Sequence, residues 1–149
     1  MKETGALLGG EMSGHVCFAD NYFGFDDAVF AAGRILQIVA QSSKKVSEML
    51  ADLPETAYTP EIRIDCPDDK KFEIVHELTE FFRNQYDVID IDGVRINFDN
   101  GWALIRASNT QPVLVLRFEA ETQTRLEELI SIVKKQMDQY RPIVQFDHH

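Results

Sequence analysis

The sequence is poor in cysteine and has no long apolar run. Its 149 residues include 2 cysteines, Cys17 and Cys66, which form no CxxC pair. A disulfide framework or a cysteine-bound metal would need more thiols at closer spacing, so we expect two reduced thiols. No stretch reaches the roughly 20 apolar residues that a membrane helix needs, and no signal peptide follows Met1. We therefore expect a cytoplasmic protein without a membrane partner.

Positive charge is also scarce. There are 15 Lys and Arg residues against 25 Asp and Glu, for a formal net charge of −10. Nucleic acids and anionic membranes bind surfaces on which Lys and Arg are clustered, so we expect no nucleic-acid partner. A single small phosphorylated molecule is compatible with this charge, because it needs only a local cluster of donors. The hydrophobic share of 44% is enough to fill a core.

Proline and glycine indicate how the chain is divided. Pro54 and Pro60 bracket a linker-like stretch, and we place a domain boundary there, between residues 1–52 and 53–149. After this boundary, apolar alternation, helical spacing and the Asp92-Gly93 and Asn100-Gly101 turns predict a strand, a helix, four strands and a helix. The strands are expected at residues 61–66, 87–90, 94–98, 102–107 and 113–119, and the helices from residue 67 and from about residue 124.

This order predicts an α+β fold. It is a two-layer domain with a largely antiparallel sheet and two helices on one face. We expect the first helix to bury a stripe that includes Phe72, Val75 and Phe82. The second helix has Thr124 and Glu127 in a capping-box pattern at its start.

Residues 1–52 contain too little sheet to close a core. We expect a glycine-rich loop, a strand at residues 15–19, a helix at 28–41 and a short helix at 44–51. The segment is therefore expected to be a fragment of an α/β domain that depends on a neighbour. His148 and His149 are expected to be a tag remnant or a tail rather than a ligand pair.

The first candidate site is the loop Arg106-Ala107-Ser108-Asn109-Thr110-Gln111-Pro112. It joins two apolar strands without glycine, and it contains one guanidinium, two hydroxyls and two carboxamides. Arginine offers a planar fork that suits phosphate oxygens, while hydroxyls, amides and turn N–H groups add neutral donors. The alternative is an ordinary turn whose Ser, Asn and Thr cap their own backbone. Arg117, at the far end of the next strand, is expected to be out of reach.

The second candidate site is the glycine-rich loop from Gly9 to His15. Its polar side chains Glu11, Ser13 and His15 are suited to sugar hydroxyls, and Glu11 with His15 could form a general acid/base pair. The alternative is that a loop glutamate and a lone histidine are structural or solvated. Neither loop has the spacing of a metal site.

The two loops together resemble a known family. Gly10-Glu11-Met12-Ser13-Gly14-His15 resembles the sugar-binding loop of the α-D-phosphohexomutases, and Arg106 to Pro112 resembles the phosphate-binding loop of their fourth domain. Phe23 to Asp27 and Asp92 to Arg95 also fit, and the resemblance covers about residues 2 to 140. Within it, Met12 is similar to the form found in bacterial phosphomannomutases/phosphoglucomutases.

The resemblance implies a fold and a function. It implies the end of domain 3 followed by domain 4, which is of the TATA-binding-protein-like type. The parent enzyme would interconvert hexose 1-phosphate and 6-phosphate through a phosphoserine, with Mg²⁺ and a hexose 1,6-bisphosphate activator. Glu11 and Ser13 would hold the sugar 3- and 4-hydroxyls, and His15 would lie near the reacting end as a possible acid/base neighbour. The phosphate would be bound by the side chains of Arg106, Ser108, Asn109 and Thr110.

The nucleophile and the metal ligands that the family uses for catalysis are missing from this chain. It has neither the phosphoserine loop of Thr-Ala-Ser-His-Asn-Pro type nor the Asp-Gly-Asp-Gly-Asp-Arg metal loop. We therefore expect a C-terminal fragment that is inactive by itself and works with the remaining domains and a hexose phosphate. Two alternatives stay open: a stand-alone, non-catalytic phosphosugar-binding module, and a structural interaction domain.

Overall fold

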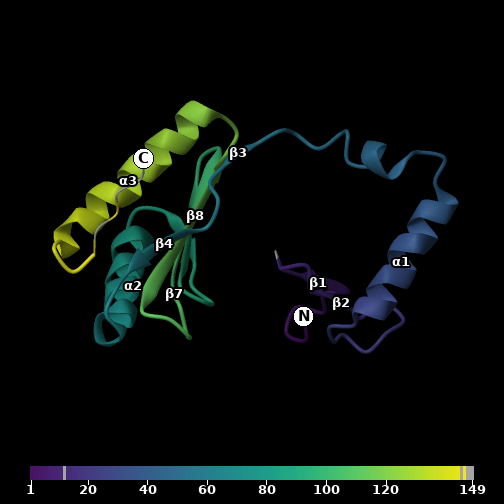
Figure 1. Ribbon diagram of the computed structural model, residues 1–149, viewed down its shortest axis with the longest axis horizontal. Helices are drawn as coiled ribbons and strands as arrows, with labels where there is room; N and C mark the ends of the chain where they lie inside the picture. Colours follow the sequence, from purple (N-terminus) through teal and green to yellow (C-terminus); the bar gives the residue numbers. More distant parts are fainter. Residues whose placement is uncertain (12, 145, 147–149) are drawn as a thin grey trace. The chain divides into compact units, whose positions relative to one another are not determined.

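The computed structural model describes residues 1–11, 13–144 and 146. The chain forms two units, Met1–Leu53 and Pro54–His149, which are described separately. Figure 1 shows the helices and strands of both.

The first unit consists of a small hairpin and a helix. Strands β1 (Leu8–Gly10) and β2 (Val16–Phe18) pair antiparallel, and α1 covers Ala28–Gln41. Asp27 begins the helix, because its carboxylate accepts hydrogen bonds of 2.9 Å from the amides of Val29 and Phe30. The helix is where the sequence predicts it, whereas β1 lies in the stretch expected to be a loop.

Apolar surface is left uncovered in this unit. No residue of α1 is buried. Its exposed apolar side chains are Val29, Ile35, Leu36 and Ile38. The helix expected at residues 44–51 is only a 3₁₀ turn, η1 (Val46–Glu48). A helix this short needs a surface to pack on, and Val46 and Leu50 are both exposed.

The second unit is α+β, with an antiparallel sheet covered by helices on one face. Strand order in the sheet is β3-β8-β7-β6-β5, and β4 pairs with the other part of β8. The strands are β3 (Ala57–Tyr58), β4 (Ile62–Asp65), β5 (Asp87–Ile89), β6 (Val94–Phe98), β7 (Gly101–Ala107) and β8 (Val113–Ala120). The helices are α2 (Asp68–Arg83) and α3 (Gln123–Met137), followed by the 3₁₀ turn η2 (Asp138–Tyr140).

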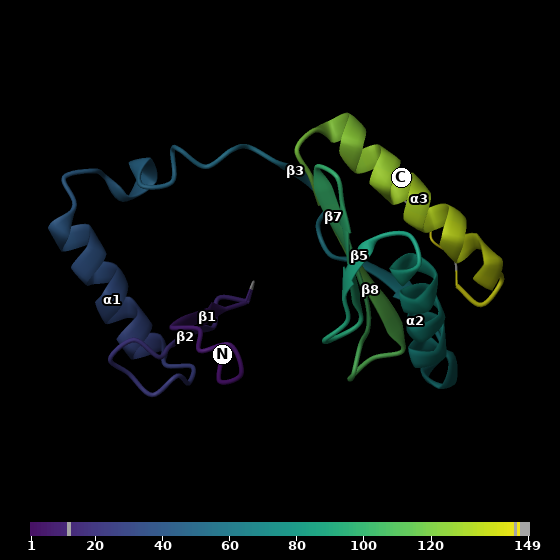
Figure 2. The same cartoon turned by 180° about the vertical axis from the view of Figure 1, so that it is seen from behind.

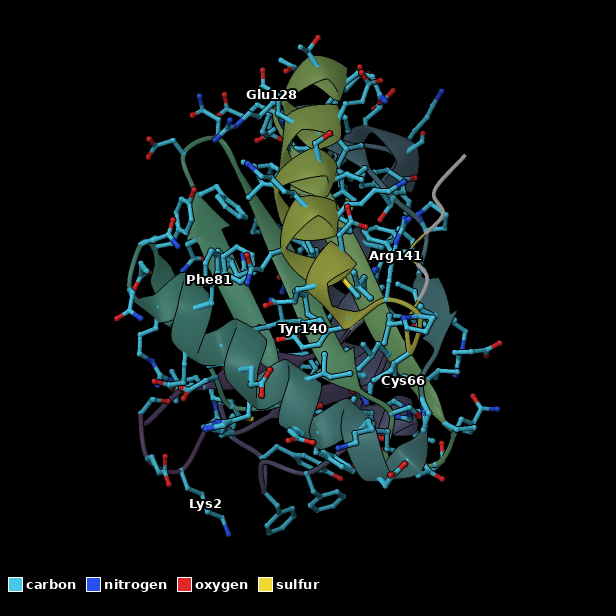
Figure 3. All side chains as sticks on the ribbon, turned by 90° about the vertical axis from the view of Figure 1, so that its left-hand side faces the viewer. Lys2, Cys66, Phe81, Glu128, Tyr140 and Arg141 are labelled. Atoms are coloured by element: carbon cyan, nitrogen blue, oxygen red, sulfur yellow. The ribbon has the colours of Figure 1, made fainter. Side chains whose placement is uncertain are left out.

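Both long helices pack on the same side of the sheet (Figures 1 and 2). Figure 3 looks onto this side, with α2 and α3 in front of the strands. The core fills the space between the two layers and includes Phe82 of α2, Leu129 of α3 and Ile105 of β7, all 0% exposed. The expected two-layer α+β fold is confirmed, with the additional short strand β3.

Two details of the helices differ from the sequence prediction. Phe72 is 55% exposed, while Lys71 beside it is 4% exposed. The reason lies in the contacts of Lys71 with the loop after β7, described below. The capping residue of α3 is Thr122, two residues before the expected Thr124, because the Thr122 hydroxyl accepts a hydrogen bond of 3.2 Å from the amide of Arg125.

Candidate functional site

Several hydrogen bonds hold the loop between β7 and β8 against neighbouring segments. The amide of Ser108 donates to the carbonyl of Val113 at 3.0 Å, and the amide of Cys66 donates to the carbonyl of Pro112 at 2.9 Å. The side chain of Arg63 on β4 also donates to the carboxamide of Gln111. The loop is therefore fixed at both of its ends to neighbouring strands.

Lys71 gives the loop an additional anchor that sequence reasoning missed. Its ammonium group donates to the carbonyl of Gln111 at 3.0 Å and to Oδ1 of Asp68 at 2.5 Å. A buried lysine needs such partners, because an unpaired ammonium group in a protein interior is strongly disfavoured. The first turn of α2 is thereby tied to the loop.

Ser108 organises the loop from within. Its side chain is buried, and its hydroxyl oxygen accepts hydrogen bonds from the amides of Thr110 at 3.3 Å and Gln111 at 3.2 Å. These two amides are therefore directed at Ser108 and do not form an open nest for an anion. The Ser108 hydroxyl can still donate its proton. The side chains of Asn109 and Thr110 are exposed.

Arg106 lies at the end of β7, on the sheet face that no helix covers. Its side chain is 38% exposed, and Nη1 lies 3.5 Å from Oδ2 of Asp92. Its Nε is buried and has no hydrogen-bond partner. Asp92 and Gly93 form the turn between β5 and β6, which touches Arg106. A Cβ at Gly93, whose φ is +81°, would lie 2.7 Å from Cα of Arg106 and 2.3 Å from the carbonyl oxygen of Ile105.

Several arginines lie on the sheet face that no helix covers. Arg106 pairs with Val115, which also pairs with Arg63, while Leu104 pairs with both Arg95 and Arg117. Directly paired residues lie on the same face of a sheet. The four arginines therefore stand on one face around Leu104 and Val115.

Arg117 is closer to Arg106 than the sequence suggests. It lies two residues beyond Val115, the partner of Arg106, and so occupies the diagonal position on the same face, a separation of about 7–8 Å between Cα atoms. Its Nε is buried without a hydrogen-bond partner, and no carboxylate in the described part of the chain forms an ion pair with it. Arg95 stacks on the ring of Trp102 at 4.8 Å.

The glycine-rich loop is the turn of the β1–β2 hairpin. The amide of Glu11 donates to the carbonyl of His15 at 3.1 Å, and that of Gly14 donates to the carbonyl of Glu11 at 3.0 Å. Gly14 has a φ of +91°, which this tight turn requires. The side chains of Glu11, Ser13 and His15 are all exposed. Met12, which carries the resemblance to the bacterial phosphomannomutases/phosphoglucomutases, lies outside the described residues.

Two carboxylates flank the His15 imidazole. Nδ1 lies 2.5 Å from Oδ2 of Asp26, and Nε2 lies 3.9 Å from Oε1 of Glu11. The hydrogen bond with Asp26, followed by the charges of Asp26 and Glu11, raises the pKa of His15 above its ordinary value. Glu11, His15 and Asp26 line one shallow hollow together with Gly9, Gly10 and Cys17. Ser13 is not part of its lining.

Neither loop is a metal site in the described residues. No group of three or more His, Cys, Asp or Glu side chains in this part of the chain could hold a metal ion. The residues present therefore do not fit a Mg²⁺ site. No described helix is long and apolar enough to cross a membrane.

Comparison with known proteins accounts for both units. Residues 61–136 match the phosphoglucomutase/phosphomannomutase C-terminal domain, and residues 1–57 match the alpha/beta/alpha domain III of the same family. The fold and the two loops thus have a common setting, and the chain belongs to the phosphoglucomutase/phosphomannomutase family.

Individual relatives agree with this assignment. A phosphomannomutase/phosphoglucomutase of Pseudomonas aeruginosa is 45% identical over 138 residues, covering 92% of this chain and 30% of the relative. A phosphoglucomutase of Neisseria gonorrhoeae is 46% identical over 132 residues, covering 87% and 28%. A crystal structure of a family protein from Burkholderia thailandensis has a TM-score of 0.78 at 34% identity, covering 97% of this chain and 30% of that one. The chain thus spans about 30% of the length of these relatives.

Proposed function

We propose that this chain supplies sugar and phosphate recognition to a phosphohexomutase that interconverts hexose 1-phosphate and 6-phosphate through a phosphoserine enzyme. In this proposal, the loop after β7 grips the phosphate that is not transferred. The hairpin loop contacts the sugar hydroxyls. Binding the distant phosphate positions the reacting end of the substrate.

The observation that carries the proposal is the state of Arg106. Its guanidinium is partly exposed on a rigid strand, with one carboxylate at the long distance of 3.5 Å and a buried Nε that has no hydrogen-bond partner. In a chain of net charge −10, a weakly paired cation beside exposed hydroxyl and amide groups favours a small dianion. We assign phosphate binding to Arg106 with Ser108, Asn109 and Thr110. Ser108 has a double role, since it also holds the loop together.

The hairpin loop supplies the sugar contacts. We assign the sugar 3- and 4-hydroxyls to Glu11 and Ser13, and the reacting end to His15. Exposed carboxylate and hydroxyl groups can accept and donate to neighbouring hydroxyls. A protonated imidazole can donate to an oxygen, and a neutral imidazole can accept from a hydroxyl.

The remaining machinery is placed outside these residues. The chain has no phosphoserine loop and no aspartate-rich metal loop. We assign the nucleophile, the Mg²⁺ and the response to a hexose bisphosphate activator to the rest of the parent enzyme. The exposed apolar side chains of α1, such as Val29 at 83% and Leu36 at 67% exposure, support a neighbouring domain that covers them.

A titration of the ¹⁵N-labelled chain with glucose 6-phosphate tests the phosphate assignment. We expect the amide signals of Ser108, Asn109 and Thr110 to shift in a saturable manner. Inorganic phosphate should shift the same signals, and glucose should not. If glucose 6-phosphate moves other amides and leaves these three unchanged, the phosphate site is misplaced.

A further inference from the structure

The contact between His15 and Asp26 joins the end of the β1–β2 loop to the segment that precedes α1. Asp26 lies eleven residues after His15, just before α1. Its backbone is fixed on one side by the antiparallel bridge between Asp26 and Cys17. On the other side it is fixed by the next residue, Asp27, which caps α1. Asp26 is thus held in place by backbone contacts that do not involve its carboxylate.

In the described part of the chain, the carboxylate of Asp26 does not cap the helix. The helix cap uses Asp27, which also accepts from the hydroxyl of Tyr22 at 2.6 Å. Among the described residues, the Asp26 side chain pairs with the imidazole of His15, with 2.5 Å between Oδ2 and Nδ1. A carboxylate at this position selects the form in which Nδ1 carries a proton, and it fixes the plane of the ring.

The imidazole of His15 lines the hollow, and its other ring nitrogen is Nε2. Nε2 lies on the side of Glu11, at 3.9 Å from Oε1, and the two side chains line the hollow together with Cys17. At this distance Glu11 and Nε2 are too far apart for a direct hydrogen bond. An oxygen atom of a bound molecule can therefore occupy the space beside Nε2. The titratable side chains that line the hollow with the imidazole are Asp26, Glu11 and Cys17, of which Asp26 and Glu11 contact or act on the ring.

We propose that Asp26 is a positioning residue for His15, which holds Nδ1 protonated so that Nε2 faces a hydroxyl or phosphate-ester oxygen of the bound sugar. The neutral imidazole accepts a hydrogen bond from a hydroxyl at Nε2, and the protonated imidazole donates one to an ester oxygen. Asp26 touches neither the sugar nor the phosphate. The identity of the ligand rests on the proposed function, whereas the state of the imidazole does not.

The carboxylates beside His15 affect the pH at which its imidazole titrates. Asp26 and Glu11 both favour the protonated imidazole, and the hydrogen bond with Asp26 is the largest cause of the raised pKa of His15. Loss of the Asp26 charge should therefore lower this pKa more than loss of the Glu11 charge. If the His15–Asp26 contact only held the hairpin next to α1, the signal of Nε2 would not need to change when a ligand binds.

The experiment follows the ring nitrogens of His15 by long-range ¹H–¹⁵N NMR across a pH series. In the parent chain, we expect the neutral ring to carry its proton on Nδ1. In Asp26→Ala the proton should move toward Nε2, the more common form, and the titration midpoint should fall. Asp26→Asn, which can still accept from Nδ1, should lower the midpoint with less change of form. Glu11→Gln should lower it least.

Asp20→Asn is the matched control. Asp20 pairs with Arg34 at 3.1 Å in the same unit and forms no ion pair with His15 in the described part of the chain. Neither the ring form nor the midpoint should therefore change. The amide signals of α1 show whether each variant has kept its fold. If Asp26→Ala unfolds the unit, Asp26→Asn still tests the midpoint. A parent ring protonated on Nε2 when neutral, or a midpoint unaffected by Asp26→Asn, would overturn the proposal.

Addition of glucose 6-phosphate separates the two claims. A shift of Nε2 in the parent chain that is lost in Asp26→Asn supports the positioning role. If glucose 6-phosphate leaves both loops unchanged while the ring behaves as described, the proposed function fails and the state of the imidazole stands. If the ligand binds but Nε2 shifts equally in Asp26→Asn, the positioning role fails alone.

Discussion

The ammonium group of Lys71 donates a hydrogen bond of 3.0 Å to the backbone carbonyl of Gln111. This contact joins α2 to the loop between β7 and β8, 40 residues further along the chain. The side chain of Lys71 is 5% exposed, and that of its ion-pair partner Asp68 is 71% exposed. The lysine is thus a buried support of the loop rather than a surface charge.

We expect Lys71→Met to destabilise the second unit by about 1.5–3 kcal/mol, because it keeps the apolar stem but removes hydrogen bonds made by a charged group. Urea unfolding can be monitored by the fluorescence of Trp102, which lies in this unit and is the single tryptophan of the sequence. Lys70→Met is the control, since Lys70 forms only an exposed pair with Glu73 and should cost less than about 1 kcal/mol. Equal effects of the two variants would contradict a support role.

The two cysteines should differ in reactivity. Burial raises the pKa of the Cys66 thiol, whose residue is 2% exposed, whereas Cys17 is only partly buried. Since the thiolate is the reactive form, a thiol reagent should label Cys17 at least about tenfold faster in the native chain. In urea both should react alike. Rapid labelling of a native Cys17→Ser variant would show that Cys66 is accessible after all.

Gly93 should not tolerate a side chain. Its φ is +81°, and a Cβ would lie 2.3 Å from the carbonyl oxygen of Ile105. We expect Gly93→Ala to destabilise the second unit by at least about 2 kcal/mol, from backbone strain and overpacking together. Asn100→Gly in the next hairpin is the matched comparison, because Asn100 has a φ of +61° and glycine removes strain there. The Trp102 unfolding midpoint should fall in the first variant and stay or rise in the second.

Arg117 should contribute to phosphate affinity at a distance. It lies diagonal to Arg106 and has no carboxylate partner among the described residues. Arg117→Gln should raise the Kd for inorganic phosphate by about two- to threefold at low salt, and by less at high salt because the interaction is screened. Arg125→Gln is the control, as Arg125 pairs with Glu128 and contacts Asp99, at the opposite end of β7 from Arg106. A loss of affinity as large for Arg125→Gln as for Arg117→Gln would contradict this role.

Local patterns predicted the elements well. The helix from Ala28 to Gln41 and the strand from Val94 to Phe98 have the bounds expected from the sequence. Helical spacing, strand alternation and Asp-Gly or Asn-Gly turns are local signals, so no tertiary information is needed. β3 was missed because two residues carry no periodicity. It exists through its pairing with Glu119 and Ala120.

Long-range contacts explain what sequence reasoning missed. Nothing local distinguishes Lys71 from the exposed Lys70 beside it. The role of Asp26 depends on a contact with His15, eleven residues earlier, which no local pattern indicates. Arg117 was judged from its distance along the chain, whereas the β7–β8 register brings it onto the diagonal of Arg106.

The affinity of the chain and its Arg106→Lys variant for glucose 6-phosphate tests the central claim most directly. Without further domains, we expect a Kd on the order of millimolar, about −4 kcal/mol, read from the amide shifts of Ser108 to Thr110. Lysine keeps the charge of Arg106 but loses its planar fork, so the Kd should rise by about 5- to 30-fold, roughly 1–2 kcal/mol. Arg125→Lys should bind like the parent chain, because Arg125 pairs with Glu128 at the opposite end of β7. If Arg106→Lys also binds as tightly as the parent, Arg106 does not hold the phosphate.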